Sequence, residues 1–340
     1  MAYDGPSDRH VLDYVIEADA PGGNPGDSSS YRRATTRQGL GLVSPLSREP
    51  LVDDGERLTT PDGKEFYPVH RGMPILVDAG SSIIGNMVLA HDGASAVKRH
   101  RRKGVSGAIK RLLSPAKPET RRNIAAFCAA LKQVDPTPLV LIIGGGTVGQ
   151  GAEALYADHA IRRVSFDIYA GEAIDFIADA HAIPLEDKSV HGVLVQAVLE
   201  HVLDPRKVVD EIWRVLADGG LVYAETPFLQ QVHEGPYDFT RFTHSGHRWL
   251  FRRFEALRSG ACGGAGTQLL WTIDYFFRAV FRSRAVGKAM KLCFFWLAYC
   301  DRISSRRHTV DTASGFYLLG RKSNEDLAPS SMPSLYAGAQ

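Results

Sequence analysis

Apolar and polar positions divide the chain into segments with different patterns. From about residue 123 onward, short continuous apolar runs alternate with segments of helical spacing. The run at residues 139–143 is apolar throughout, which is typical of a strand buried on both faces. Further strands are predicted at residues 164–167, 174–178, 190–195, 221–226, around 256–259 and at 315–321, and helices at residues 123–134, 148–157, 205–216 and 245–254. This alternation predicts an α/β fold with a doubly wound, mostly parallel sheet of seven strands.

The residues before this region follow other patterns. Residues 1–38 are rich in Gly, Pro and Ser and predict a disordered extension. Residues 39–78 hold short apolar pieces separated by turns, which predicts a small β-rich module. Residues 79–122 read as a basic linker, because 98–122 contain ten Lys or Arg and one Glu. This run is either solvated or in contact with an anionic surface or substrate.

Composition narrows the class of protein. The 340 residues are 44% hydrophobic and 23% charged, with a net charge of +2, which excludes wholesale disorder and a basic nucleic-acid coat. No nucleic-acid partner is therefore expected. The four scattered cysteines favour neither a zinc knuckle nor a disulfide framework. Because no signal peptide or run of 18 apolar residues is visible, we expect a cytoplasmic protein.

A glycine-rich loop follows the first strand of the predicted sheet. Gly144, Gly146 and Gly149 satisfy the G-x-G-x-x-G spacing, which lets the backbone approach a ligand before a helix begins. Asp167 ends the next strand, 18 residues after Gly149, where a carboxylate can bind both ribose hydroxyls. Its alternative role is to cap a helix. Together these residues predict a nucleoside-containing cofactor, with NAD and S-adenosylmethionine both open.

The segments that follow distinguish between NAD and S-adenosylmethionine as the cofactor. Residues 177–185, 189–202 and 215–222 resemble class I S-adenosylmethionine-dependent methyltransferases, in particular the branch that acts on small molecules, lipids and glycans. The resemblance covers about residues 123–260, with a last strand at 315–321, and implies a Rossmann-like methyltransferase domain at 123–323 with S-adenosylmethionine as cofactor. Ile143 stands where this family often has an acidic residue, which leaves the contact with the cofactor amino group open.

The resemblance also implies roles for individual residues. The three loop glycines would lie against the methionine part, Asp167 would bind the ribose, and Ile168 would pack on the adenine. The adenine amino group would be bound by Asp179, with the Ala180 backbone nearby, and the sulfonium end would be lined by a segment that includes Gln196 and Val198.

A second resemblance concerns residues 46–77. They look like the small zinc-ribbon-derived module related to the partner subunit of certain tRNA and protein methyltransferases. The metal-binding cysteines of that module are absent here, so zinc is not expected. A structural or substrate-orienting role is predicted for the module.

The acceptor is expected at a loop after the strand at 221–226. Residues 226–243 leave the carboxyl end of a central strand, where ligands bind in open α/β sheets, and resemble a loop of methyltransferases encoded with polysaccharide and glycolipid biosynthesis. A hydroxyl acceptor must lose its proton, so His233 is the first candidate base and His201 the second. Asp238 would orient the imidazole and Arg241 would hold the acceptor; alternatively, the two only pin the loop. No metal site is expected, because His233, Asp238, His244 and His247 lack a recognised ligand spacing.

The chain ends in apolar helices and a predicted flexible tail at residues 324–340. The helical insertion at 268–307 combines broad apolar faces with Lys and Arg, which favours either a core or dimer interface or a peripheral contact with the inner face of a membrane. The predicted function is O-methylation of a sugar, glycolipid or other small hydroxylated acceptor. An NAD(P)-dependent oxidoreductase and a non-catalytic cofactor-binding scaffold are the rival readings, and the oligomeric state stays open.

Overall fold

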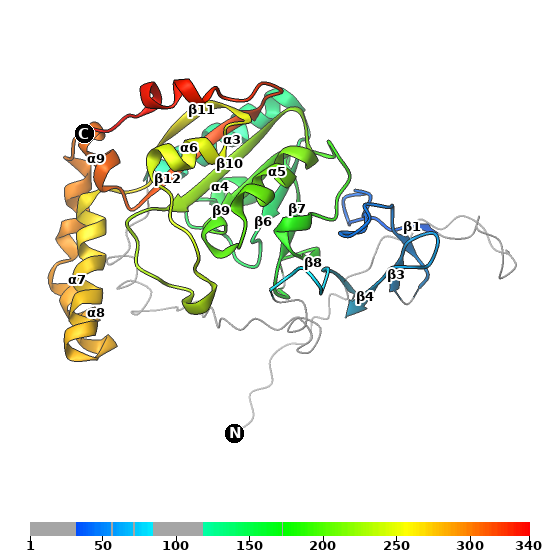
Figure 1. The fold of residues 1–340 in the computed structure, drawn as a ribbon, viewed down its shortest axis with the longest axis horizontal. Helices are drawn as coiled ribbons and strands as arrows, with labels where there is room; N and C mark the ends of the chain where they lie inside the picture. The colour runs from blue at the N-terminus through cyan, green and yellow to red at the C-terminus, as the bar shows by residue number, and fades with distance from the viewer. Residues whose placement is uncertain (1–31, 56, 71, 84–117, 172) are drawn as a thin grey trace, which may run out of the picture.

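The computed structural model describes residues 32–55, 57–70, 72–83, 118–171 and 173–340. Its centre is the predicted seven-stranded sheet, in the order β8-β7-β6-β9-β10-β12-β11 (Figure 1). The strands from β8 to β10 are parallel, and β12 runs antiparallel to both of its neighbours. The strands span β6 (Leu139–Ile143), β7 (Arg162–Asp167), β8 (Phe176–Ala178), β9 (Val190–Gln196), β10 (Leu216–Pro227), β11 (Phe254–Ala261) and β12 (Gly315–Lys322). The mostly parallel α/β fold is thus confirmed.

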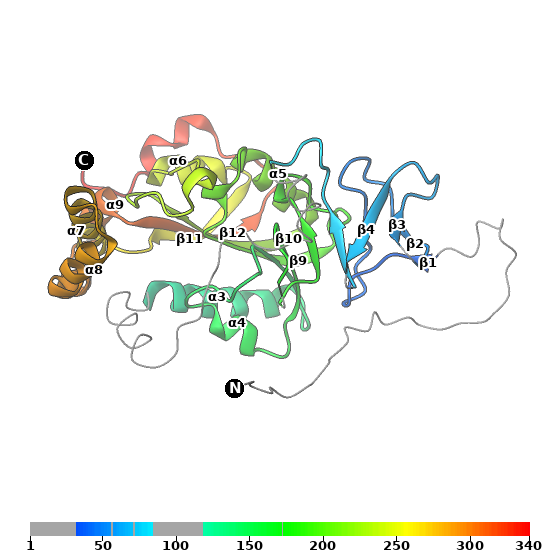
Figure 2. The same ribbon diagram turned by 90° about the horizontal axis from the view of Figure 1, so that it is seen from below.

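Helices cover both faces of this sheet. Figure 2 shows α3 (Pro118–Val134) and α4 (Glu153–Ala157) on one face, and α5 (Pro205–Val215) and α6 (His244–Leu250) on the other. The apolar stripe of α3, which includes Phe127 and Leu131, is fully buried against the central strands. Two predicted helices are shorter than expected. In the helix predicted at 148–157, residues 148–152 form a loop, because Gly151 has a φ of +88°. The helix predicted at 245–254 ends at Leu250, because β11 begins four residues later.

The N-terminal β-rich module extends the same sheet. Its strands are β1 (Arg32–Arg33), β2 (Val52–Asp53), β3 (Arg57–Thr59), β4 (Phe66–His70) and β5 (Met73–Leu76). They pair in sequence as antiparallel neighbours, and β5 then pairs in parallel with β8, which produces one sheet of twelve strands. The predicted β-rich module thus continues the seven-stranded sheet, because the edge of β8 offers backbone groups that β5 pairs with.

Several predicted boundaries can be compared with the structure. Strand β1 lies within the predicted extension, and α3 begins within the predicted basic linker. Residues 1–31 and 84–117, which include most of the basic run, lie outside the described residues. The predicted flexible tail is tied to α9 (Arg306–Thr312): Tyr336 Oη donates to Asp311, and the Ala339 N–H donates to the same carboxylate over 2.8 Å.

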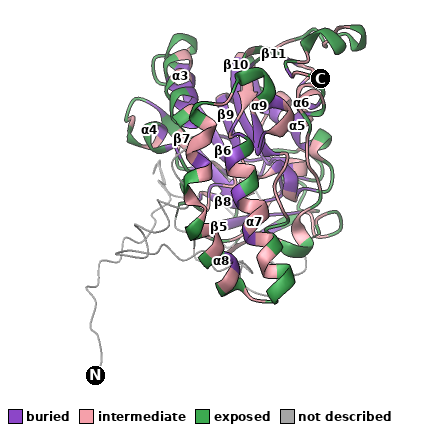
Figure 3. Cartoon of the chain, turned by 90° about the vertical axis from the view of Figure 1, so that its left-hand side faces the viewer, coloured by how far each residue is buried: buried purple, intermediate pink, exposed green. Residues whose placement is uncertain are grey.

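The helical insertion stands beside the far edge of the sheet (Figure 1). It comprises α7 (Ala265–Phe281), α8 (Arg284–Cys293) and the 3-10 helix η5 (Phe295–Arg302). The two α-helices approach closely at Gly287, where a Cβ atom would lie 2.5 Å from Asp274 Oδ1. Figure 3 looks onto this pair and colours many of its residues as half-buried or exposed. None of the helices in the described residues is long and apolar enough to span a membrane.

Candidate active site

A cavity of about 690 Å³ opens at the carboxyl ends of the parallel strands. This edge of the sheet is where open α/β folds bind their ligands. The cavity is lined by all nine predicted cofactor residues: Gly144, Gly146, Gly149, Asp167, Ile168, Asp179, Ala180, Gln196 and Val198. His201 and His233 line the same cavity, so the structure joins the predicted cofactor end to the predicted acceptor end.

Each glycine of the loop faces a side chain of the cavity wall. A Cβ atom at Gly144 would lie 2.5 Å from Val198 Cγ2, and one at Gly146 would lie 2.7 Å from Asp167 Oδ2. At Gly149 a Cβ atom would collide with Gln196 Oε1. Gly144 also has a φ of +77°, which L side chains rarely adopt. The loop can therefore lie against the wall only because these positions lack side chains.

The two carboxylates expected to bind the nucleoside are held in place by hydrogen bonds. Asp167 accepts from the Gly146 N–H over 3.0 Å and from the Tyr169 N–H over 3.3 Å. Asp179 accepts from the His181 N–H over 2.9 Å and from Ser82 Oγ over 2.6 Å. Burial raises the pKa of Asp179, but the hydrogen bonds from His181 and Ser82 outweigh it and lower the pKa below its usual value. This carboxylate is therefore ionised at neutral pH.

The N-terminal module reaches this end of the cavity. Ser82, which binds Asp179, lies a few residues after β5, and Ile83 lines the cavity itself. Arg48 of the module also pairs with Glu211 of α5 over 2.7 Å. The module thus helps to build the wall around the expected adenine site.

Glu225 is a cavity residue that the sequence analysis missed. It lies on β10 opposite Gln196 of β9, is 6% exposed and lines the cavity. Its carboxylate accepts from Thr120 Oγ1 over 2.7 Å, from Tyr223 Oη over 2.5 Å and from Gln196 Nε2 over 2.9 Å. An acidic residue inside an otherwise apolar strand was the available signal, because a charge is buried in a strand only where something compensates it.

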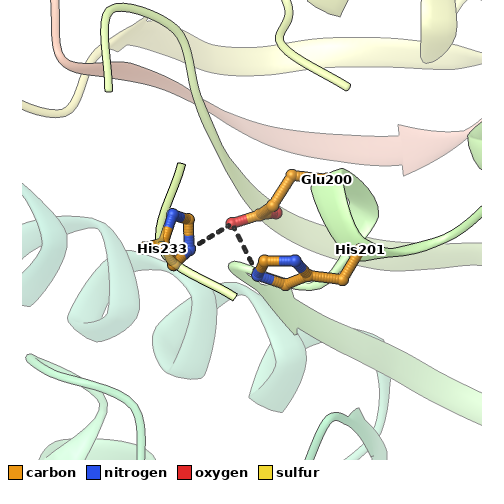
Figure 4. Close-up of side chains that lie close together, drawn as sticks. All are labelled: Glu200, His201 and His233. Atoms are coloured by element: carbon orange, nitrogen blue, oxygen red, sulfur yellow. Dashed lines mark ion pairs between the residues drawn. The ribbon is translucent and has the colours of Figure 1, made fainter. Parts of the chain in front are cut away.

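At the acceptor end, two imidazoles point toward one buried carboxylate (Figure 4). The Nε2 atoms of His201 and His233 lie 3.7 and 3.9 Å from Glu200 Oε1. Glu200 and His201 belong to the short 3-10 helix η3 (Leu199–His201) that follows β9, and His233 comes from the loop after β10. The Glu200 side chain is only 1% exposed, whereas that of His233 is 26% exposed.

The other nitrogen of each ring fixes its tautomer. His201 Nδ1 lies 2.7 Å from the Tyr237 carbonyl oxygen, and His233 Nδ1 lies 3.3 Å from Asp238 Oδ2. A carbonyl and an ionised carboxylate only accept, so each Nδ1 carries a hydrogen, and each Nε2 faces Glu200. Burial lowers the pKa of His201, which keeps that ring neutral. Among the described residues, this cluster could take up either a proton from a ligand or a metal ion.

Asp238 and Arg241 form a paired unit within the loop. Arg241 binds both carboxylate oxygens of Asp238 and donates to the carbonyl oxygens of Gln230, over 3.0 Å, and Thr240, over 2.9 Å. The hydrogen bond from Arg241 lowers the pKa of Asp238 to about 2. Asp238 also accepts from the His233 N–H over 2.9 Å and so orients that residue.

Neither Arg241 nor Asp238 lines the cavity, and the contact of Arg241 with an acceptor stays a prediction. His244 and His247 also lie elsewhere. His244 packs on Phe316 at a ring distance of 5.5 Å, and His247 packs on Phe251 at 5.1 Å. Of the four residues weighed as metal ligands in the sequence, only Asp238 therefore lies against His233.

Residues 144–224, from the glycine loop to the middle of β10, match the family model described as "Methyltransferase domain". The protein carries a class I S-adenosylmethionine-dependent methyltransferase domain. The oxidoreductase alternative is therefore wrong. The methyltransferase cavity also fits this cofactor: it has a side-chain-free loop, two fixed carboxylates, and a Gln196 Oε1 atom that has no hydrogen-bond partner in the described part of the chain.

Solved structures similar to the methyltransferase include a "putative sarcosine dimethylglycine methyltransferase" from Galdieria sulphuraria, with 17% identity and a TM-score of 0.41, over 61% of this chain and 86% of that chain. Phosphoethanolamine N-methyltransferase 2 of Haemonchus contortus, in complex with S-adenosyl-L-methionine, has 14% identity and a TM-score of 0.37, over 65% of this chain and 58% of that chain. No curated protein matches the chain. The acceptor of this enzyme, and the resemblance of residues 46–77 to a partner subunit, stay predictions.

Proposed function

We propose that the enzyme transfers the methyl group to an oxygen of a hydroxylated acceptor, such as a sugar or a glycolipid. The supporting observation is the pair of imidazole Nε2 atoms that converge beside Glu200 at the end of the cavity. A hydroxyl group is a weak nucleophile until its proton leaves, so a neutral imidazole suits this acceptor. When bound, S-adenosylmethionine supplies a methyl group that its sulfonium already activates. The residues of the chain orient the acceptor, exclude water and take its proton.

His233 is the proposed base. Its side chain is more exposed than that of His201, 26% against 17%, so an acceptor reaches it more easily. Asp238 lies against Nδ1 and Glu200 lies near Nε2, and both carboxylates stabilise the imidazolium that forms when His233 takes the proton. His201, held by the Tyr237 carbonyl, positions the acceptor from the other side of the cluster.

Gln196 and Glu225 are the proposed partners of the cofactor amino group. Ile143 is apolar and 3% exposed, so it supplies no acceptor beside the glycine loop. The Glu225 carboxylate and Gln196 Oε1 line the same cavity as Gly149. The three donors to Glu225 are neutral, so an ammonium group would add the positive charge that a buried carboxylate favours.

The outer face of the helical insertion is the proposed contact with a membrane surface. Large apolar side chains project from it beside basic ones, which is the composition that suits the headgroup boundary. The exposed large apolar side chains of the insertion are Leu269, Phe276, Val280, Phe281, Leu292, Trp296 and Ile303. A lipid-linked acceptor would then reach the cavity from the side of α7, whose Trp271 lines it.

The acceptor chemistry can be tested by transfer of labelled methyl from S-adenosylmethionine to separated lipid, glycan and small-molecule fractions. Label bound through oxygen in a glycan or lipid would support the proposal. Label on nitrogen or carbon would contradict it, and cofactor binding without any transfer would favour the scaffold alternative. A chelator should leave the rate unchanged; loss that Mn²⁺ restores would assign the cluster at Glu200 to a metal ion instead.

A further inference from the structure

A second cavity, of about 770 Å³, adjoins the cluster at His233. One wall is the loop after β10, with Val232, His233 and Gly235, and the other wall is formed by α7, α8 and the turn between them. His233 lines both cavities, so the second one, called the basic groove below, opens directly beside the proposed base. The sequence analysis placed no site at this position.

Among the described residues, the basic groove is lined by no carboxylate and by four cationic side chains, those of Arg278, Arg282, Arg284 and Lys288. The charge of Arg278 is balanced by the buried Asp274, whose two oxygens lie 2.6 Å from its Nε and Nη2 atoms. No acidic side chain of the described residues forms an ion pair with the other three. The positive charge along the groove is therefore largely uncompensated.

The two walls are fixed to each other. Tyr275 Oη donates to the Val232 carbonyl oxygen over 2.9 Å, and Gln231 Nε2 donates to Thr272 Oγ1 over 3.1 Å. The Arg278 guanidinium lies 4.8 Å from the centre of the Tyr275 ring. These contacts hold the basic wall at a set position relative to His233. A preorganised wall of this kind loses little entropy when a ligand binds.

We propose that the basic groove binds a phosphate or diphosphate group of the acceptor while the acceptor hydroxyl lies at His233. Guanidinium groups match the oxygens of a phosphate in a bidentate manner, and several cations suit a group that carries more than one negative charge. A soluble phosphorylated sugar and a lipid-linked sugar phosphate share this chemistry. The proposal rests on the proposed O-methylation and adds the anionic group that the acceptor carries.

Binding to the groove can be measured without knowing the acceptor. Inorganic pyrophosphate is titrated by calorimetry into the full chain, in the presence of S-adenosylhomocysteine. We expect saturable binding that weakens about tenfold in the double variant Arg282→Gln, Lys288→Gln. The matched control is Arg302→Gln, since Arg302 lies on η5 against Tyr299 and outside the groove. Absent binding, or equal binding by the double variant, would overturn the proposal.

The identity of the labelled acceptor gives an independent measurement. The double variant should raise the KM for that acceptor about tenfold with little change in kcat, because uniform binding is lost rather than transition-state stabilisation. Phosphatase or mild acid treatment should destroy the substrate, and partition into organic or aqueous solvent separates the lipid source from the soluble one. If the wild type and the double variant methylate a phosphate-free acceptor equally, phosphate binding in the basic groove is refuted, whereas O-methylation is not. If no fraction accepts a methyl group, the proposed O-methylation is refuted. The pyrophosphate titration then tests by itself whether the basic groove binds phosphate.

Discussion

The backbone N–H of Gly146 donates to Asp167 Oδ2 over 3.0 Å, and a Cβ atom at position 146 would lie 2.7 Å from that same oxygen. This contact joins the loop after β6 to the end of β7. The hydrogen bond holds the carboxylate that is expected to bind the ribose. A side chain at position 146 would collide with that carboxylate.

The variant Gly146→Val should therefore lose cofactor affinity by at least about a hundredfold, because Val displaces Asp167 or the loop. The fold should persist, since the change lies at the mouth of the cavity. Calorimetry with S-adenosylhomocysteine and thermal unfolding by circular dichroism measure the two effects. Gly80→Ala is the control, because a Cβ atom there meets only Asp78 Oδ1 at 3.4 Å. Undiminished affinity in Gly146→Val would refute the loop assignment.

The variant His233→Ala should keep cofactor affinity and reduce turnover by about 10²- to 10⁴-fold, because the acceptor proton loses its base. Labelled methyl transfer and calorimetry measure turnover and cofactor affinity separately. His159→Ala, at an exposed position after α4, should behave like the wild type. If His233→Ala turns over normally while His201→Ala does not, the base role belongs to His201.

Glu225→Gln should weaken the binding of S-adenosylhomocysteine by about tenfold, because the cofactor ammonium loses a buried anion. Binding of 5′-methylthioadenosine, which lacks the amino-acid part, should not change. Comparing the two ligands by calorimetry separates this contact from general damage around Tyr223 and Thr120. Equal losses for both ligands would show that Glu225 supports the wall rather than the amino group.

The stability of the protein should fall as the pH falls below about 6.5, in part because of His247. Burial lowers the pKa of this side chain, which is 3% exposed, to about 3. Between that value and the usual 6.5, the unfolded chain binds a proton that the native state excludes, so each pH unit costs about 1.4 kcal/mol. Urea unfolding at several pH values should show a shallower dependence for His247→Leu. Identical slopes would contradict the assignment.

Vesicles that contain anionic phospholipid should sediment with the wild-type enzyme. The double variant Phe276→Asp, Phe281→Asp should reduce the bound fraction severalfold, because these side chains are 58% and 57% exposed on α7 and would otherwise enter the headgroup layer. Leu46→Asp, in the N-terminal module and 63% exposed, is the control. Unchanged vesicle binding by the double variant would show that this face of α7 does not contact the membrane. A change in the molar mass of the double variant in solution would indicate a dimer interface instead.

The local sequence was enough to predict the central sheet and nine cofactor residues that line the cavity. Strand β6 is apolar throughout, and each of Gly144, Gly146 and Gly149 is recognisable from spacing, because burial on both faces and a tight turn impose requirements within a few residues. The carboxyl ends of β6, β7 and β9 meet at one edge of the sheet, so residues that end these strands necessarily gather there.

The tertiary structure alone decided which distant groups meet. The pairing of β5 with β8 depends on an open edge of the sheet. Arg241 forms its hydrogen bonds within its own loop because that loop folds back on Gln230. Glu225 became a cavity residue through its register opposite Gln196. Glu200 and its sequence neighbour His201 met the imidazole of His233 through the return of a loop more than thirty residues later in the chain. Periodicity reports how a segment is buried, but the neighbour across a sheet or a cavity is set by long-range packing, which no local pattern encodes.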